Sequence, residues 1–307
     1  MYRHTTDEVV MIRPKQFYMN EETAVNNAYQ KRSDESIVNI QKKALKEFDD
    51  LASLLKSHGL KVHVLQDSET PSTPDSIFPN NWFSTHEGGL MSIYPMFATN
   101  RQAEVPKFID EVTKISKEKT SSEFLRLYDY QPAIYDEKYL EGTGAIVIDR
   151  KVKVAYCVLS PRADKALFEQ WCKDTRHTPV SFRAEQDGQA VYHTNVIMGI
   201  GERNAVICLD SIVDLDERKK VEESLKEAGN TVIDISLDQV KHFLGNNLEL
   251  KGKNGNFLAM SKDAYDSLTP TQKETIEKET PIVYADISTI EYYGGGSVRC
   301  MIAEIFE

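Results

Sequence analysis

The fold of this chain is decided by the stretch Gly295-Gly296-Ser297-Val298-Arg299-Cys300-Met301-Ile302, in which a small and polar cluster leads directly into an apolar run. Four earlier stretches repeat this order: Pro79-Asn80-Asn81-Trp82-Phe83, Glu141-Gly142-Thr143-Gly144-Ala145-Ile146-Val147, His193-Thr194-Asn195-Val196-Ile197 and Gly245-Asn246-Asn247-Leu248-Glu249-Leu250. Their anchors Asn81, Thr143, Asn195, Asn247 and Ser297 are spaced by 62, 52, 52 and 50 residues. Such near-even spacing indicates a structural unit that recurs along the chain.

Helical patterns fall between these clusters. Apolar residues three and four positions apart predict a helix over residues 36–58, and Ser160-Pro161 is expected to start another, with Ser160 as its N-cap. Further helices are expected at 103–117, 214–228 and 269–279. Strand-like runs surround them, at 9–12, 62–65, 145–148, 152–158, 205–209, 231–235, 257–260 and 282–284. The pattern predicts one α/β domain over residues 1–307, built from about five similar modules.

The composition excludes several classes of function. With 37 Lys and Arg against 48 Asp and Glu, the net charge is −11, which argues against a broad nucleic-acid or anionic-membrane surface. It still allows a small anionic group to be held by one or two local arginines. No apolar run approaches the roughly 18 residues of a membrane span, and residues 1–14 lack the pattern of a signal peptide. A soluble protein of the cytoplasm is expected.

The four cysteines are scattered, and no two of them have the C-x-x-C spacing, so neither a disulfide framework nor a zinc site is expected. We interpret Cys157, Cys172 and Cys208 as structural residues that fill core volume. Cys300 differs, because three glycines at 294–296 let the backbone approach a ligand closely just before it. This stretch taken by itself leaves two interpretations of Cys300 open, an exposed thiolate or a buried cysteine beside a flexible turn, and it favours the second.

Two other side chains occupy the corresponding position in their own modules. His193 opens one cluster, and Glu141 opens another. Taken singly, each would be an ordinary polar or solvated residue. In a closed arrangement of repeats, however, equivalent edges converge on the central axis. A nucleophile, an acid/base and a carboxylate would then meet in one pocket.

On these residues the chain resembles the guanidino-group-modifying enzymes, namely arginine deiminases, amidinotransferases and dimethylarginine hydrolases. The resemblance implies the pentein fold, an α/β five-bladed propeller of ββαβ-type modules around a pseudo-fivefold axis. It also implies roles: Cys300 as the nucleophile, His193 as the acid/base and Glu141 as the carboxylate that holds the substrate. Neither a metal nor an organic cofactor is implied.

The resemblance extends to residues that would bind the substrate. Ser160-Pro161-Arg162-Ala163 is similar to the family segment whose arginine holds the substrate carboxylate, which gives that role to Arg162. Arg101, which follows Asn81 by 20 residues, is a second carboxylate partner by similar spacing. Asn81 and Asn195 would orient the head group of the substrate. The expected partner is therefore a small amino acid, and a homodimer is the default assembly.

Within the superfamily, Met11-Ile12-Arg13-Pro14, the segment 22–27 and Pro79-Asn80-Asn81-Trp82-Phe83 look like the citrulline-utilisation hydrolases. Deiminases carry aspartate where this chain has Asn81 and Asn195. A cationic guanidinium favours carboxylates, whereas an amide can both donate to and accept from a neutral ureido group. We therefore expect hydrolysis of L-citrulline to ornithine, ammonia and CO2 through a thioester on Cys300.

Other functions stay open at this point. An arginine deiminase, a dimethylarginine hydrolase and an amidinotransferase would use the same three residues. A binding protein without chemistry can be built on the same fold.

Overall fold

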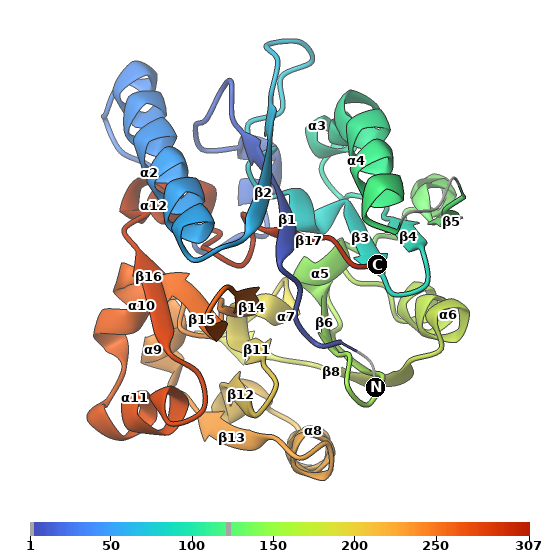
Figure 1. Ribbon diagram of the computed structural model, residues 1–307, viewed down its shortest axis with the longest axis vertical. Coiled ribbons are helices and arrows are strands. Elements are labelled where there is room, and N and C mark those ends of the chain that lie inside the picture. Colours follow the sequence, from blue (N-terminus) through green and yellow to red (C-terminus); the bar gives the residue numbers. More distant parts are fainter. Residues whose placement is uncertain (1–2, 121–123) are drawn as a thin grey trace.

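The computed structural model describes residues 3–120 and 124–307, and in these residues it contains five three-stranded sheets. Their strand orders are β17-β1-β2, β3-β4-β5, β6-β7-β8, β11-β12-β13 and β14-β15-β16. In every sheet the middle strand pairs antiparallel with the first strand of this order and parallel with the last. Figure 1 shows the five sheets grouped around the middle of the molecule, with the long helices outside them. The predicted five-module α/β fold is confirmed.

The strands are short. Each of the eight predicted runs matches an observed strand to within a few residues, whereas other strands, such as β4, β5 and β8, were not predicted. Their bounds are β1 Glu8–Arg13, β2 Lys61–Gln66, β3 Phe83–His86, β4 Leu90–Ile93, β5 Arg126–Asp129, β6 Ile146–Asp149, β7 Val154–Val158, β8 Thr178–Phe182, β11 Met198–Ile200, β12 Asn204–Ile207, β13 Thr231–Asp234, β14 Leu248–Gly252, β15 Gly255–Ser261, β16 Ile282–Ala285 and β17 Ala303–Glu304. A small hairpin of β9 (Glu185–Gln186) and β10 (Gln189–Ala190) follows the third sheet. Because β17 pairs with β1 (Val9 opposite Glu304), segments near both ends of the chain meet in one sheet.

Each parallel pair of strands is joined by a helical crossover, as parallel pairing requires. The crossovers are α2 (Ile37–Ser57), α3 and α4 (Thr99–Gln102 and Glu104–Thr120), α6 (Lys165–Thr175), α8 (Leu215–Glu227), and α10 with α11 (Lys262–Ser267 and Pro270–Glu277). The remaining helical segments are short: α1 Glu21–Ala24, η1 Pro79–Asn81, η2 Gln131–Asp136, α5 Gly142–Ala145, α7 Thr194–Ile197, η3 Leu209–Ser211, α9 Leu237–Lys241 and α12 Ser288–Gly294.

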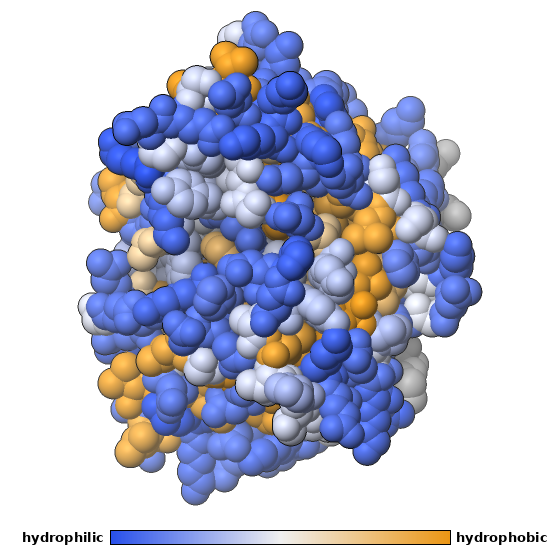
Figure 2. All heavy atoms as spheres, turned by 90° about the vertical axis from the view of Figure 1, so that its left-hand side faces the viewer, coloured by the Kyte–Doolittle hydropathy of each residue, from blue (hydrophilic) through white to orange (hydrophobic). Residues whose placement is uncertain are grey.

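The predicted apolar stripe of α2 explains how a crossover packs. Its buried side chains include Ile40, Ala44, Phe48 and Leu51, which face the first sheet and β14–β15. Ser36 caps its first turn by accepting from the Asn39 N–H. The outer face of the molecule over α2, α10 and α11 is mainly hydrophilic, with hydrophobic side chains in scattered groups (Figure 2). None of the helices in the described part of the chain combines the length and apolar character needed to cross a membrane.

The expected helix start at Ser160 is wrong. Residues 160–163 form a turn closed by a hydrogen bond from Ala163 N–H to Ser160 O (3.0 Å). Helix α6 begins only at Lys165, because the Asp164 carboxylate caps it by accepting from Leu167 N–H (2.9 Å). Arg162 therefore lies in the turn before the helix, and the N-terminus of α6 does not position it.

Three of the five polar clusters form single helical turns before their strands, where the sequence predicted a direct transition into a strand. These turns are η1, α5 and α7, which lead into β3, β6 and β11. All residues of these three turns are buried. The polar side chains of these clusters therefore lie in the interior of the molecule.

Candidate active site

Equivalent segments of the five modules meet in one buried site. Asn81 ends η1, Glu141 precedes α5, His193 precedes α7, Asn246 precedes β14, and Cys300 lies in the turn before β17. A cavity of about 20 Å³ lies among them. It is lined by Asn27, Asp75, Phe78, Asn81, Arg101, Arg162, Tyr192, His193, Gly294, Gly295, Gly296 and Cys300. The sequence thus identified residues of different modules that the fold brings together.

His193 and Glu141 form a hydrogen-bonded pair at the base of the site. The Nε2 atom of His193 lies 2.7 Å from Oε2 of Glu141, and the other carboxylate oxygen accepts from Phe97 N–H (2.9 Å). Burial by itself would raise the pKa of Glu141, but Arg162, His193 and Arg101 together lower it to about 2. Glu141 is therefore ionised, which makes His193 Nε2 the protonated nitrogen and leaves the lone pair on Nδ1.

Burial also governs the charge of His193. It lowers the pKa of the ring, and the opposing attraction of Glu141 is offset by Arg162 and Arg101. The resting imidazole is neutral near pH 7, so it can accept a proton at Nδ1.

Cys300 is buried, as the second of the two interpretations predicted. Its side chain is only 5% exposed, yet the sulfur meets polar groups. Asn195 Nδ2 donates to Sγ at 3.4 Å, and Asn246 Nδ2 donates to it at 3.2 Å. Hydrogen bonds donated to sulfur stabilise the negative charge of a thiolate. The surroundings of Cys300 thus suit a nucleophile, whereas Cys157 and Cys208 are buried in the apolar core.

The amides of Asn81 and Asn195 have opposite orientations. Arg101 Nη1 donates to Asn81 Oδ1 (2.7 Å), which turns the amide nitrogen of Asn81 towards the centre of the site. In Asn195 the nitrogen is engaged with Cys300. Within the described residues, neither Asn81 Nδ2 nor Asn195 Oδ1 has a hydrogen-bond partner. The site therefore holds one unpaired amide donor and one unpaired amide acceptor.

Two glycines permit this close approach of modules. Gly142 has φ +45°, and a Cβ there would lie 2.5 Å from the Asn80 carbonyl oxygen. A Cβ on Gly144 would lie 2.3 Å from Asn81 Nδ2 and 2.8 Å from His193 Nδ1, so these two nitrogens are neighbours. Any larger residue at position 144 would displace one of them.

The two predicted arginines already have partners inside the protein. Arg101 forms a two-point ion pair with Glu104 (2.8 and 3.1 Å) and donates to Phe78 O (2.9 Å). Its guanidinium therefore positions Asn81. Arg162 instead holds a single amide oxygen, Oδ1 of Asn26, with both Nε (2.8 Å) and Nη2. This fork is the geometry in which arginine binds a carboxylate.

Sequence analysis missed Asp75, Asn246 and Asn26. Asp75 belongs to the stretch 68–76, whose content of Pro, Ser and Thr is typical of a surface loop, but residues 73–76 are buried. Its Oδ2 accepts from Asn20 (2.8 Å) and Thr23 (3.0 Å), and its Oδ1 has no hydrogen-bond partner among the described residues. Asn246 could have been found, because it belongs to one of the repeated clusters. Asn26 lies in the segment 22–27 on which the resemblance partly rests, although no role was predicted for it, and Asp75 carries no pattern that distinguishes it from loop residues.

The family model for N,N dimethylarginine dimethylhydrolase, eukaryotic, matches residues 13–307. The chain belongs to this family. It is therefore a pentein of the guanidino-group-modifying superfamily, whose hydrolases act on guanidino C–N bonds. No curated protein matches the sequence.

Solved structures share the pentein fold with this dimethylarginine dimethylhydrolase family member. The N-terminal domain of ArgZ, an arginine dihydrolase from the ornithine-ammonia cycle in cyanobacteria, solved with product, matches with a TM-score of 0.75 and 16% identity over 98% of this chain and 97% of its own. AgrE, in its ternary complex with ornithine and NAD+, matches with a TM-score of 0.74 and 16% identity over 98% of this chain and 39% of its own. A dimethylarginine dimethylaminohydrolase, solved as the adduct of a histidine-to-glycine variant with S-methyl-L-thiocitrulline, matches with a TM-score of 0.66 and 14% identity over 99% of both chains.

Proposed function

We propose that this pentein hydrolyses the ureido group of a free amino acid, with L-citrulline as its preferred substrate and Cys300 as its nucleophile. The observation that carries the proposal is the pair of unpaired amide atoms, Asn81 Nδ2 and Asn195 Oδ1. A ureido head group has a carbonyl oxygen that accepts and an NH2 group that donates. In the proposed binding mode, the carbonyl oxygen accepts from Asn81 Nδ2 and the NH2 group donates to Asn195 Oδ1.

A guanidinium fits this pair less well. All its polar atoms are donors, so Asn81 Nδ2 would face another donor and stay unpaired. An unpaired buried polar group costs about 1–3 kcal/mol. Rotating the Asn81 amide does not solve the problem, because Arg101 requires the oxygen on its own side. The charge of Glu141, the nearest carboxylate to His193, is already balanced by Arg162, and its Oε2 also lies 2.7 Å from His193 Nε2.

The first chemical step uses Cys300 and His193. His193 Nδ1 accepts the thiol proton, and the Cys300 sulfur forms a bond to the ureido carbon. The bond from this carbon to the δ-nitrogen of the substrate then breaks as His193 returns the proton to that nitrogen. Ornithine leaves, and an S-carbamoyl thioester remains on Cys300. Glu141 stabilises the imidazolium at each transfer.

In the second step a water molecule attacks the carbamoyl carbon. His193 Nδ1 takes a proton from this water, and the C–S bond breaks with its electron pair going to sulfur. His193 then returns the proton to the thiolate, and the Cys300 thiol regains its hydrogen bonds to Asn195 and Asn246. The released carbamate decomposes to ammonia and CO2. No group other than side chains and water is needed to balance either step.

The amino-acid end of the substrate would bind at Arg162 and Asp75. The α-carboxylate replaces the Asn26 oxygen in the Arg162 fork, and the α-ammonium pairs with the free Oδ1 of Asp75. A cavity of about 20 Å³ holds roughly one water molecule. The segment that carries Asn26 and Asn27 must therefore move away before an amino acid can enter.

The arginine-directed alternative has its own support, because the chain belongs to a dimethylarginine hydrolase family and ArgZ is named as an arginine dihydrolase. Purified protein is to be incubated with citrulline, arginine or dimethylarginine, and ornithine, citrulline and ammonia measured. Equimolar ornithine and ammonia from citrulline support the proposal. Release of citrulline from arginine or dimethylarginine, with citrulline itself untouched, overturns it. Cys300→Ala is the control: it abolishes turnover in an enzyme, whereas a binding protein shows none to lose.

A further inference from the structure

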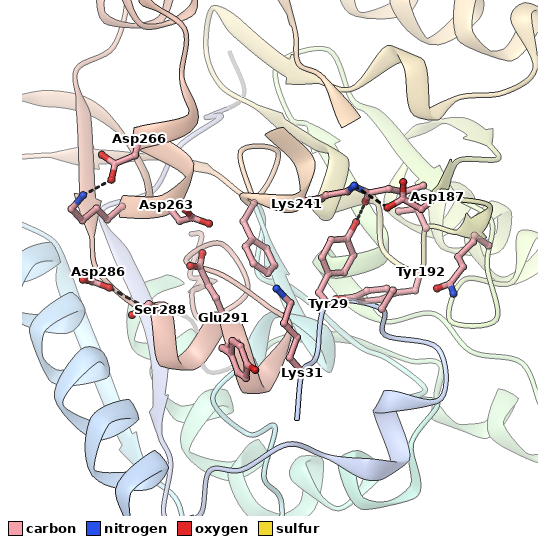
Figure 3. A pocket seen from close by; sticks show the side chains of 18 residues that line it. Tyr29, Lys31, Asp187, Tyr192, Lys241, Asp263, Asp266, Asp286, Ser288 and Glu291 are labelled. Carbon is pink, nitrogen blue, oxygen red and sulfur yellow. Dashed lines mark hydrogen bonds and ion pairs between the residues drawn. The ribbon is translucent and has the colours of Figure 1, made fainter. Parts of the chain in front are cut away.

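A second and much larger cavity, of about 710 Å³, lies beside the catalytic one. It is bounded by residues 28–31, the β9–β10 hairpin, α9, α10 and α12 (Figure 3). Its volume is within the usual range of small-molecule sites. Tyr192 lines both cavities, so the two are separated by the thickness of one side chain.

The charges of this cavity favour a ligand with a net positive charge. Five carboxylates line it, from Asp187, Asp263, Asp266, Asp286 and Glu291, together with three lysines, Lys31, Lys241 and Lys262. Lys241 pairs with Asp187 and Lys262 with Asp266, while Asp263 contacts the exposed His242. Within the described residues, Lys31 takes part in no ion pair, and neither does Glu291.

Glu291 points most directly to a ligand. It is 5% exposed, and no basic side chain of the described chain lies within ion-pair distance of it. Oε1 accepts from Ser297 Oγ (2.6 Å), and burial raises the pKa of the carboxyl to about 7. A buried carboxylate without a cationic partner is costly, and a cation from a ligand would remove that cost. In Figure 3 the carboxylates of Glu291 and Asp263 lie together on one side of the cavity, with Lys31 between them and Tyr29.

We propose that this cavity is a binding site for a second free amino acid, one with a cationic side chain. The side-chain cation binds at Glu291 and Asp263, and the α-carboxylate binds Lys31. The rings of Tyr29 and Phe243, whose centroids are 5.5 Å apart, cover the aliphatic part of the ligand. Both signs of charge are needed, so a simple diamine or a neutral amino acid would use only part of the site.

A ligand in this site would touch two contacts that hold the nucleophile turn. Glu291 binds Ser297, whose carbonyl accepts from Cys300 N–H (2.9 Å). Tyr192 donates its hydroxyl to Gly295 O (2.8 Å), in the glycine turn before Cys300. Occupancy of the site is therefore coupled to the placement of Cys300, and the coupling is reciprocal. Ornithine is both such a ligand and the reaction product only if the proposed function holds. The binding site itself does not depend on the proposed function.

Calorimetric titration with L-lysine tests the site, because lysine has no ureido or guanidino group and cannot be turned over. We expect saturable binding that Lys31→Ala and Glu291→Gln each weaken by at least tenfold, about 1.4 kcal/mol. Gln at 291 keeps an oxygen for Ser297, so the nucleophile turn stays in place. The exposed residues Lys117 and Glu118 of α4 supply matched controls, Lys117→Ala and Glu118→Gln, which should leave the dissociation constant unchanged.

Two further titrations decide the location and the ligand class. Norleucine, which lacks the side-chain cation, should bind at least tenfold more weakly than lysine, and Arg162→Ala should not alter lysine binding. Absence of saturable binding overturns the proposal. So does binding that Arg162→Ala abolishes and Lys31→Ala spares, because lysine would then occupy the catalytic cavity alone. Since Lys31 is exposed, its substitution tests the site even if the Glu291 variant fails to fold.

Discussion

Asn246 and Cys300 are joined by a hydrogen bond from Nδ2 to Sγ of 3.2 Å, and the Oδ1 atom of the same asparagine accepts from the backbone N–H of Arg299 at 3.0 Å. One side chain thus holds both the sulfur and the backbone just before it. The amide cannot rotate without losing both contacts. Asn246 is therefore a positioning residue for the proposed nucleophile.

Asn246→Ala should reduce kcat by roughly 10- to 100-fold, since a hydrogen bond to a charged group contributes about 1.5–3 kcal/mol. The rate of Cys300 alkylation by iodoacetamide should fall as well, because the thiolate loses a donor. Asn247→Ala is the matched control, as Asn247 Nδ2 donates to Leu244 O and not to sulfur. Equal losses in both variants would contradict a specific role for Asn246.

Replacing both head-group amides by carboxylates should move the preference towards arginine. In the double variant Asn81→Asp and Asn195→Asp, the ratio of kcat/KM for arginine to that for citrulline should rise by at least about tenfold. A cationic guanidinium gains charge-assisted hydrogen bonds there, and a neutral ureido group loses its donor. The measurement is the release of ammonia from each substrate. An unchanged ratio would remove the structural argument for citrulline.

In the proposed binding mode Asn26 competes with the substrate carboxylate for Arg162, so its substitution should act mainly on KM. Asn26→Asp places a permanent carboxylate in the fork and should raise KM by roughly tenfold, because Arg–carboxylate pairs are among the stronger hydrogen-bonded contacts. Asn26→Ala removes the competitor and should lower KM. Steady-state kinetics with citrulline distinguish the two directions. KM values that move together in both variants would show that Asn26 matters only for loop structure.

Glu141→Gln should lower kcat by roughly 100-fold or more, since it removes the charge that stabilises the imidazolium of the proposed acid/base. The measurement is single-turnover kinetics, with Glu118→Gln on the exposed face of α4 as the control. An unchanged kcat in Glu141→Gln would show that the charge of Glu141 takes no part in the reaction.

The same carboxyl should also make stability depend on pH. The pKa of Glu141 is lowered to about 2 from 4.5, so its ionisation stabilises the fold above pH 4.5, and this contribution is lost as the pH falls towards 2. The difference in unfolding free energy between the wild type and Glu141→Gln should therefore shrink between pH 5 and pH 2. Urea unfolding at several pH values measures it. A difference that stays constant over this range would mean that the charge of Glu141 does not contribute.

The residues of the site that lie in the repeated clusters could be predicted from the sequence. Cys300, His193, Glu141, Asn81 and Asn195 all lie in recurring clusters, and equivalent positions of similar modules converge wherever the modules surround an axis. Asp75 and Asn26 belong to connecting segments of irregular structure. Their positions depend on hydrogen bonds to distant residues, such as Arg162 to Asn26, and no local pattern encodes such a contact.

The orientation of each of these side chains could not be predicted from the local sequence either. Nothing near Ser160 in the chain indicates that Asp164 caps α6, and the burial of Cys300 depends on segments from other modules. The sequence alone determined the modular α/β architecture and pointed to the side chains proposed to react, because apolar periodicity and repeated polar clusters are local properties of the chain. Only the tertiary structure decided which oxygen or nitrogen of each amide faces the reactants and which charges neutralise one another. Those choices arise from electrostatic contacts that exist only after distant segments have packed together.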